Sequence, residues 1–218
     1  MAGQRSLAGH EAVPSNRVSV AHSIIGVSRG RPASDFYPTP AYVTEALLAR
    51  ETFTGTVWEP ACGDGAMSRV LEQKLPLCRI LSTDISDYGF GHPGVDFLKT
   101  HLKVDGIITN PPFRLAHEFA VHSLECADKV ALFLRLQFLE GARRYCLFRE
   151  SPLKTVYVFS RRVSLNRNGI KQTQKRGMMA FAWFVWDKNY QGPPQLDWIL
   201  ESINKPCNRK MTDDSAPA

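Results

Sequence analysis

The chain has 218 residues, of which 44% are hydrophobic and 22% are charged, and it carries a formal net charge of +6. This length predicts one domain with appendages, and the composition excludes both a disordered chain and a membrane protein. The first twenty residues lack the continuous apolar centre of a secretory signal, and the five cysteines form no Cys-x-x-Cys pair. We therefore expect a cytoplasmic protein with reduced thiols, no metal site and no membrane association.

Residues 1–34 and 204–218 show no helical or alternating periodicity, so we expect a basic, flexible N-terminal arm and a flexible C-terminal tail around a domain at 35–203. Within the domain, strand-like apolar runs alternate with helix-like stretches, which is typical of βαβ units in a mainly parallel sheet. The expected helices are 41–50, 66–75, 115–127, 142–148 and 196–203. The expected strands are 56–59, 79–83, 106–109, 129–136, 153–159 and 178–186, with an exposed loop at 166–176.

The first expected strand leads into a Gly-x-Gly turn that opens a helix, in the run Glu59-Pro60-Ala61-Cys62-Gly63-Asp64-Gly65. Glycines allow the backbone to approach a ligand closely, because they lack a Cβ and adopt positive φ angles. A dinucleotide fingerprint would place a third glycine three residues after Gly65, where Ser68 stands, so an NAD or FAD site is disfavoured. An ordinary strand-to-helix turn is the alternative interpretation.

Acidic residues follow this turn at two informative places. Asp84 ends the second expected strand, nineteen positions after Gly65, where a carboxylate can accept both hydroxyls of a ribose. Further on, Asp96 could lie beside an adenine amino group while Phe97 packs against the adenine ring. The alternatives are a capping aspartate at 84, and a surface aspartate beside a core phenylalanine at 96 and 97.

The tetrad Asn110-Pro111-Pro112-Phe113 follows the expected strand 106–109, and is the most specific motif of the chain. The prolines remove two backbone donors, which leaves the Asn110 and Pro111 carbonyls as free acceptors beside the Asn110 side-chain oxygen. These acceptors can hold both protons of a planar NH2 group, and Phe113 can stack on the conjugated system that carries it. The tetrad therefore predicts methylation of a weakly nucleophilic amine without a general base.

Basic residues are concentrated between residues 141 and 177, where ten Lys or Arg stand against the single acid Glu150. Such a stretch is typical of a face that binds nucleic acid. Its candidate phosphate-contacting residues are Arg143, Arg144, Arg161, Arg162, Lys171, Lys175 and Arg176. For Arg161 and Arg162, a solvated sheet edge is the alternative interpretation.

Taken in order, these motifs resemble those of S-adenosylmethionine-dependent methyltransferases that act on amino groups. The similarity is closest to DNA adenine-N6 methyltransferases of the small phage and prophage type. Upstream, the run from Asp35 to Pro40 resembles the segment with which such enzymes close over the methionine part of the cofactor. Downstream, the run from Leu134 to Gly141, with Arg143 and Arg144, resembles a strand and helix of the phage group.

The resemblance implies an α/β, three-layer Rossmann-like methyltransferase fold, whose seven-stranded sheet is mostly parallel with an antiparallel last strand. It implies S-adenosylmethionine as cofactor, and catalytic roles for Asn110, Pro111, Pro112 and Phe113. The implied cofactor-binding residues are Tyr37, Thr39, Glu59, Ala61, Cys62, Gly63, Gly65, Asp84, Ile85, Asp96, Phe97 and Asn110.

The implied activity is methyl transfer to the N6 amino group of adenine in DNA. The separate target-recognition domain of larger family members is not visible, so we expect modest sequence preference. Adenine in RNA and the amide of a protein glutamine are alternative substrates, since both amino groups are planar and conjugated. A catalytically inactive nucleic-acid-binding module is a further alternative, although the intact Gly63, Gly65, Asp84 and Asn110 argue against it.

Overall fold

The computed structural model describes residues 36–165 and 179–200. The strands of this part are β1 (Thr56–Glu59), β2 (Arg79–Ser82), β3 (Val104–Thr109), β4 (Ala127–Arg135), β5 (Leu153–Phe159), β6 (Phe181–Asp187) and β7 (Gln195–Ile199). The α-helices are α2 (Ala41–Leu48), α3 (Ala66–Lys74), α4 (Ala116–Cys126) and α5 (Tyr145–Glu150). Single 3-10 turns are η1 (Phe97–Lys99), η2 (Phe113–Leu115), η3 (Leu136–Leu139) and η4 (Ala142–Arg144). The expected arm, tail and loop at 166–176 lie outside the described residues.

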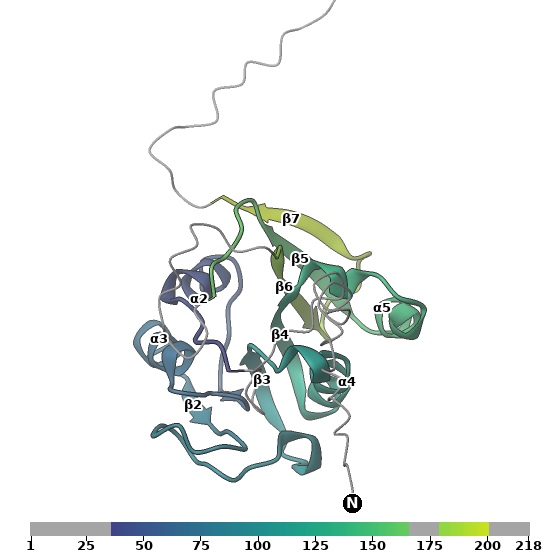
Figure 1. Cartoon of the computed structure of the whole chain (residues 1–218). Coiled ribbons are helices and arrows are strands. Elements are labelled where there is room, and N and C mark those ends of the chain that lie inside the picture. Colours follow the sequence, from purple (N-terminus) through teal and green to yellow (C-terminus); the bar gives the residue numbers. More distant parts are fainter. Residues whose placement is uncertain (1–35, 166–178, 201–218) are drawn as a thin grey trace, which may run out of the picture. The chain divides into compact units, whose positions relative to one another are not determined.

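The strands form one seven-stranded sheet in the order β2-β1-β3-β4-β6-β5-β7 (Figure 1). Neighbouring strands pair in parallel, except that β6 is antiparallel to both β4 and β5. This topology confirms the predicted α/β fold with a mostly parallel sheet and one antiparallel strand. The antiparallel strand is β6, which overlaps the last strand predicted from the sequence, at 178–186.

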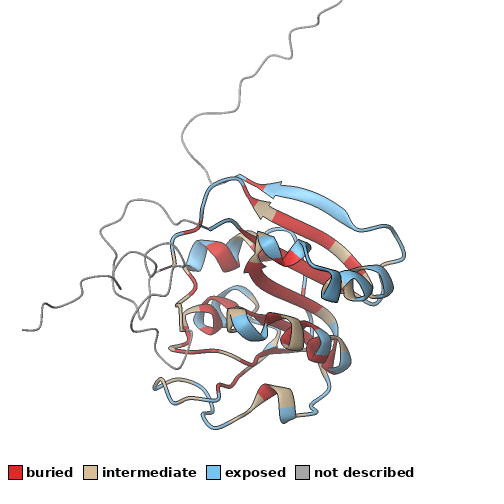
Figure 2. Cartoon of the chain, turned by 45° about the vertical axis from the view of Figure 1, so that its right-hand side comes forward, coloured by how far each residue is buried: buried red, intermediate tan, exposed pale blue. Residues whose placement is uncertain are grey.

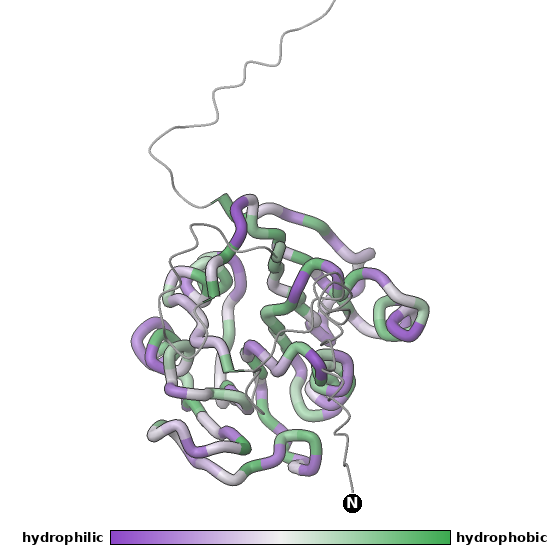
Figure 3. The backbone as a smooth tube through the Cα atoms, viewed as in Figure 1, coloured by the Kyte–Doolittle hydropathy of each residue, from purple (hydrophilic) through white to green (hydrophobic). Residues whose placement is uncertain are grey.

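Helices cover both faces of the sheet and make three layers (Figure 1). On one face, α2 and α3 pack against side chains such as Ile108 and Phe133. On the other face, α4 packs against Ile107 and Leu132, joined by side chains of α5. Successive residues of β3 and β4 thus enter opposite cores, so the stretches 106–108 and 130–134 of these strands are continuously apolar rather than alternating (Figure 3). In the described residues, no helix is both long and apolar enough to cross a membrane.

The strand β7 corrects the sequence prediction, which placed a helix at 196–203. Residues Gln195–Ile199 instead pair in parallel with β5, from Thr155 to Phe159. The apolar residues at 196, 199 and 200 fit a helical stripe, but β5 offers a row of unpaired backbone groups that a strand satisfies. Figure 2 shows β7 as an exposed edge strand, with Trp198 57% exposed and Leu196 53% exposed.

The other boundaries differ by a few residues from the predicted ones. The strand predicted at 178–186 is β6, which begins at Phe181, whereas residue 178 lies outside the described part. The helix predicted at 142–148 is divided into the turn η4 and the helix α5. Helix ends commonly take the tighter 3-10 geometry, which accounts for this division.

A buried carboxylate joins α2 to the sheet on the side of β4 and β5. Glu51 is 2% exposed, and its Oε2 accepts from the ammonium groups of Lys129 at 2.6 Å and Lys154 at 2.8 Å. Its Oε1 accepts from the hydroxyl of Tyr157 at 2.7 Å. Burial raises the pKa of the Glu51 carboxyl, but these three hydrogen bonds together outweigh burial and lower the pKa below its usual value.

Replacing this carboxylate should destabilise the fold in a pH-dependent way. We expect Glu51→Gln to lower the free energy of unfolding by about 3 kcal/mol at pH 7, because two part-buried ammonium groups lose this partner and only Lys129 keeps another carboxylate nearby, that of Asp187 at 3.7 Å. The folded pKa is depressed, so the carboxylate's contribution is complete above its unfolded pKa of about 4.3 and is lost as the pH falls through the lower folded pKa. Urea unfolding at pH 7 and at pH 3 measures both effects.

Glu45→Gln is the matched control, since Glu45 forms an ion pair of 3.0 Å with Lys74 on the surface, where both side chains are 45% exposed. It should change the free energy of unfolding by less than about 0.5 kcal/mol at either pH. Equal effects of the two substitutions would contradict the role assigned to Glu51.

Candidate active site

The carboxyl ends of β1, β2 and β3 meet at one edge of the sheet, because these three neighbouring strands are parallel. The glycine turn, residues 60–65, leaves β1 at this edge. A second loop leaves β2 after Ser82, and the tetrad 110–113 leaves β3 after Thr109. In parallel α/β sheets, ligands bind at this edge. The sequence-predicted site residues 59–65, 84, 85 and 110–113 are therefore gathered in one place.

The glycine turn is held to the loop that follows β2. Gly63 has a φ of +52°, and Gly65 caps α3 in the left-handed region with a φ of +80°. The Gly63 N–H donates to Asp84 Oδ2 at 2.9 Å, and the Cys62 N–H donates to the carbonyl of Thr83 at 3.0 Å. These bonds fix the turn against the end of β2, and α3 starts from it at the same edge, where the N–H of its first residue, Ala66, donates to Asp64 Oδ1 at 3.1 Å.

Asp84 organises this edge through both carboxylate oxygens. Besides the bond to Gly63, its Oδ1 accepts from the N–H of Ser86 at 2.8 Å, and the residue is 8% exposed. An ionised carboxylate offers about four lone-pair positions, so two acceptor positions remain. Asp84 can therefore bridge two loops and still receive hydroxyl groups. The neighbouring Ile85 is 65% exposed, and Ala61 is half-buried in the turn itself.

An aromatic cover over the glycine turn was not predicted from the sequence. A Cβ placed on Gly63 would lie 2.2 Å from the ring of Phe36, and a Cβ on Gly65 would lie 2.5 Å from the ring of Phe90. Phe36 also stacks on Tyr88, with 4.5 Å between ring centroids. The Phe36 and Phe90 rings leave no room for a Cβ, so both positions require glycine. A ligand bound on the turn would contact or displace these rings. Only the tertiary fold, not sequence periodicity, brings residues 36, 88 and 90 together.

The two residues predicted to contact adenine, Asp96 and Phe97, make contacts within the chain. Phe97 is 2% exposed and its ring packs against Trp58, Phe119 and His122, so it is a core residue. Asp96 Oδ1 accepts from the Leu98 N–H at 3.2 Å, which caps η1. The packing of Phe97 favours the alternative interpretation, a core phenylalanine beside a part-exposed aspartate.

Glu59, at the end of β1, is a buried acid. It is 2% exposed and accepts a hydrogen bond from the hydroxyl of Ser68, which lies 2.6 Å from the hydroxyl of Ser82. Burial, together with the nearby carboxylates of Asp84 and Asp64, raises the pKa of Glu59 well above its usual value. The Cys62 thiol is buried beside it, and burial and the charge of Glu59 raise the pKa of this thiol to about 12, which excludes a thiolate nucleophile.

Asn110 has a fixed orientation at the end of β3. Its Nδ2 donates to Thr39 Oγ1 at 3.0 Å and to the carbonyl of Tyr37 at 3.3 Å. The carbonyl can only accept, so these bonds determine which end of the amide is the nitrogen. The side-chain Oδ1 of Asn110 is buried and accepts no hydrogen bond from the described residues. The predicted acceptor is therefore present, desolvated and unused, and the segment 37–39 positions it.

Phe113 lies half-buried within a group of aromatic and basic side chains. Its ring centroid is 5.6 Å from that of Tyr37 and 5.7 Å from that of Phe181. The guanidinium carbon of Arg135, the last residue of β4, lies 4.3 Å from the Phe113 centroid in a cation–π contact. Pro111 is buried and Pro112 half-buried. Arg135 was not among the predicted site residues, although its place at the carboxyl end of a strand is a signal by which it could have been found.

The predicted phosphate-contacting residues differ in whether their side chains are already bound within the chain. Arg144 donates to the carbonyls of Phe138 and Glu140, so it holds the turn η4. Arg143 pairs with Glu118 of α4 at 3.2 Å, whereas Arg161 and Arg162 are exposed after β5. Three further candidates lie outside the described residues, namely Lys171, Lys175 and Arg176.

Comparison with solved structures finds methyltransferases. The methyltransferase subunit of a type I restriction-modification system from Streptococcus thermophilus aligns with a TM-score of 0.54 and 14% identity, over 73% of this chain but only 46% of that subunit. The 23S rRNA methyltransferase ErmE gives 0.48 at 15% identity, covering 73% and 71% of the two chains. A dimethyladenosine transferase from Plasmodium falciparum gives 0.47 at 15% identity, covering 70% and 62%. No protein-family model and no curated protein matches the sequence.

The sheet order, the antiparallel β6 and the similarity to the restriction-modification subunit agree with one another. The described part of the chain has the Rossmann-like fold of methyltransferases.

The raised pKa of Glu59 generates a stability prediction for this site. A buried acid with a raised folded pKa destabilises the fold as the pH rises from its unfolded pKa, about 4.3, to the folded value. Glu59→Gln keeps an acceptor for Ser68 but does not titrate. We therefore expect the free energy of unfolding of the variant, relative to that of the wild type, to rise by about 1.4 kcal/mol for each pH unit in that range. Urea unfolding at pH 4.5 and pH 7.5 measures this gain, and Glu72→Gln on the exposed side of α3 serves as control. A constant difference at both pH values would mean that Glu59 is ionised in the folded protein.

Proposed function

We propose that this protein transfers a methyl group from S-adenosylmethionine to the N6 amino group of adenine in DNA. The observation that carries the proposal is the buried, unpaired Oδ1 of Asn110 at the carboxyl end of β3. A buried acceptor without a partner costs about 1–3 kcal/mol, which is unusual unless a donor arrives with a ligand. An amino group is such a donor.

The chemistry of an adenine amino group calls for hydrogen-bond acceptors rather than for a general base that removes a proton. The lone pair of an adenine amino group is delocalised into the ring, so the nitrogen is a weak nucleophile. Asn110 Oδ1, together with backbone carbonyls of the two residues 110 and 111, can accept both amino protons and favour a more tetrahedral nitrogen with a localised lone pair. These acceptors act most strongly as positive charge develops on the nitrogen, so they stabilise the transition state more than the ground state.

The residues at the sheet edge fit S-adenosylmethionine. Asp84 has two unused acceptor positions for ribose hydroxyls, and the glycine turn lets a ligand approach the backbone closely beside it. Tyr37 and Thr39 would line the methionine part, because Asn110 binds both of them. Ile85, 65% exposed beside Asp84, is available to an adenine ring. When bound, the cofactor supplies an electrophilic methyl group.

Phe113 is assigned to the target base. Its ring is half-buried, and the Arg135 guanidinium covers one face, so the opposite face is the one that a base can stack on. The rings of Tyr37 and Phe181 also contact it, tilted by 30° and 44°. In duplex DNA, the base must first leave the stack, at a cost of a few kcal/mol that such stacking partly offsets.

DNA is favoured over a protein substrate by charge. The exposed Arg161 and Arg162 and the wider basic stretch 141–177 suit a polyanion, whereas a glutamine-bearing protein gains nothing from them. Adenine in RNA carries the same amino group on a similarly charged backbone, so a direct comparison of the two nucleic acids decides between them.

Removing the Asn110 side chain should separate catalysis from cofactor binding. We expect Asn110→Ala to reduce kcat for DNA methylation by at least about 100-fold, while the affinity for S-adenosylmethionine changes only a few-fold. Thr39→Val is the matched control, because it removes a partner of Nδ2 but leaves Oδ1 in place. It should reduce kcat by less than about 10-fold. Transfer of a labelled methyl group and calorimetric titration of the cofactor measure the two quantities.

Three substrates are compared in the same assay: duplex DNA, RNA, and a glutamine-containing peptide. The proposal expects transfer to DNA to be fastest. Preferred transfer to RNA or to the peptide would overturn the assignment of the substrate, and an unchanged kcat of Asn110→Ala at saturating cofactor would overturn the assigned role of the amide.

The exposed arginines after β5 should contribute to the salt dependence of DNA binding. The logarithm of the affinity should fall with the logarithm of the salt concentration, with a slope of about −0.9 for each phosphate contact. The double variant Arg161→Ala/Arg162→Ala should flatten this slope by about 0.9 for each phosphate that an arginine no longer neutralises. Fluorescence anisotropy at several salt concentrations measures the slope.

Arg144→Ala provides the control, because the Arg144 guanidinium is already bound to backbone carbonyls. It should leave the slope unchanged and lower stability instead. An unchanged slope in the double variant would show that residues 161 and 162 are a solvated edge.

A further inference from the structure

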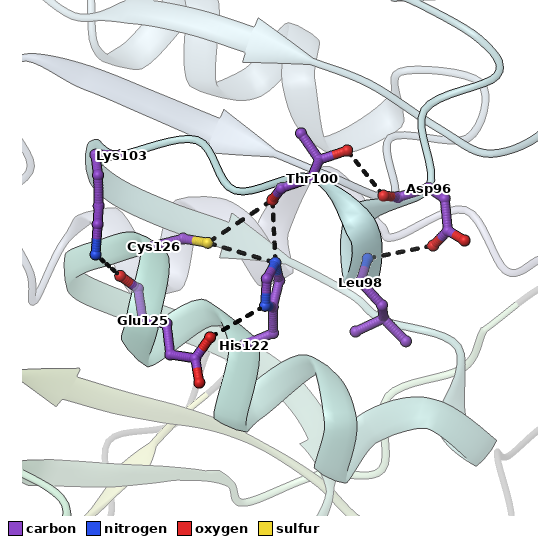
Figure 4. Close-up of polar contacts among 7 residues, drawn as sticks. All are labelled: Asp96, Leu98, Thr100, Lys103, His122, Glu125 and Cys126. Carbon is purple, nitrogen blue, oxygen red and sulfur yellow. Dashed lines mark hydrogen bonds and ion pairs between the residues drawn. The ribbon is translucent and has the colours of Figure 1, made fainter.

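A second polar cluster lies at the opposite edge of the sheet, far from the tetrad. It joins the C-terminal end of α4 to the loop between η1 and β3 (Figure 4). The helix α4 starts after the carboxyl end of β3 and ends at Cys126, next to the first residue of β4. Val104 of β3 pairs with Ala127 of β4, so the cluster lies at the amino ends of these strands.

Three potential metal ligands converge in this cluster. One ring nitrogen each of His101 and His122 and one carboxylate oxygen of Glu125 lie within 4.8 Å of one another. The two imidazole rings are in edge contact, with 5.1 Å between centroids. His122 and Glu125 are one helical turn apart on α4, and His101 comes from the facing loop. His122 is 7% exposed, whereas His101 and Glu125 are exposed.

The hydrogen bonds of His122 orient one ring nitrogen toward this cluster. Nε2 lies 3.1 Å from the carbonyl of Thr100, which can only accept, so Nε2 carries the proton. Nδ1 then has a free lone pair, and it lies 3.5 Å from Glu125 Oε2. A metal-binding histidine typically donates its other N–H to a backbone carbonyl in this way. The ring is held further by edge contact with Phe97, at 4.8 Å between centroids.

Cys126 belongs to the other side of the ring. Its Sγ lies 3.5 Å from Nε2, together with the Thr100 carbonyl, and burial raises the pKa of its thiol. The ligand set therefore consists of two imidazoles and one carboxylate, without the thiol. With water in the remaining position, this set suits a tetrahedral Zn²⁺.

We propose that His101, His122 and Glu125 form a binding site for a divalent transition-metal ion, of which Zn²⁺ is the best match. Zn²⁺ binds imidazole nitrogen at about 2.0–2.1 Å and carboxylate oxygen at about 2.0–2.2 Å. The ligand atoms must therefore approach one another slightly, and the exposed side chains of His101 and Glu125 can rotate to do so while His122 stays in place. The ion would fasten the loop before β3 to α4, and neutralise the carboxylate. The proposal departs from our sequence-based expectation of no metal site, and sequence spacing did not suggest it because His101 is distant from the other two ligands in the chain.

The test measures Zn²⁺ binding to the full chain carrying Cys146→Ser and Cys207→Ser, which removes an exposed thiol and a thiol outside the described residues. Competition with a chromophoric chelator gives the affinity, and elemental analysis after dialysis gives the stoichiometry. We expect one Zn²⁺ per chain. His101→Ala and Glu125→Gln, both at exposed positions, should each weaken binding at least about 10-fold.

His92→Ala, at an exposed histidine outside the cluster, should leave the affinity unchanged. Zn²⁺ should also raise the melting temperature of the parent protein but not that of Glu125→Gln. Zn²⁺ binding that is absent, or that is equal in the parent protein, His101→Ala and Glu125→Gln, would overturn the proposal.

Discussion

The orientation of one carboxamide sets the chemistry of this site. The Nδ2 of Asn110 is bound by the Tyr37 carbonyl and the Thr39 hydroxyl, so its Oδ1 is left buried with no partner. Rotating the amide would set Oδ1 against the Tyr37 carbonyl, which can only accept, so that hydrogen bond would be lost and replaced by repulsion between two oxygens. The segment 37–39 therefore keeps an acceptor available and oriented. The proposed activity needs such a preorganised acceptor, because reorientation during the reaction would consume much of its benefit.

The parallel sheet brings the rest of the site to this acceptor. Because β1, β2 and β3 run in the same direction, the glycine turn, Asp84 and the tetrad all emerge at one edge. Asp84 then ties the first two loops together through Gly63 and Ser86, while Asn110 ties the tetrad to the segment before α2. The proposed cofactor binding and methyl transfer would thus share one framework of hydrogen bonds. The proposed metal site at the other edge secures the loop that carries η1, so it would act on the same framework from the opposite side.

Sequence patterns predicted those parts of the fold that local physics determines. The continuously apolar runs of β3 and β4, buried on both faces, and the turn at Gly63 and Gly65 fall into this class. The helix predicted at 196–203 was wrong, since pairing with the free edge of β5 outweighs a helical apolar stripe. The aromatic cover by Phe36 and Phe90 could not be predicted, because it depends on loops that only the tertiary fold brings together. Phe97 shows the same limit, since local sequence does not distinguish a core ring from a ligand-binding one.

The central claim is that Asn110 presents its acceptor to an exocyclic amine. It is tested most directly by identifying the methylated atom. DNA incubated with the protein and S-adenosylmethionine is digested to nucleosides, which are separated and compared with standards by mass spectrometry. The account predicts N6-methyldeoxyadenosine as the product, absent when Asn110→Ala replaces the wild type. Methylation at a ring nitrogen, a ring carbon or a sugar oxygen would contradict it, because none of these positions offers the two protons that the acceptors are arranged to receive.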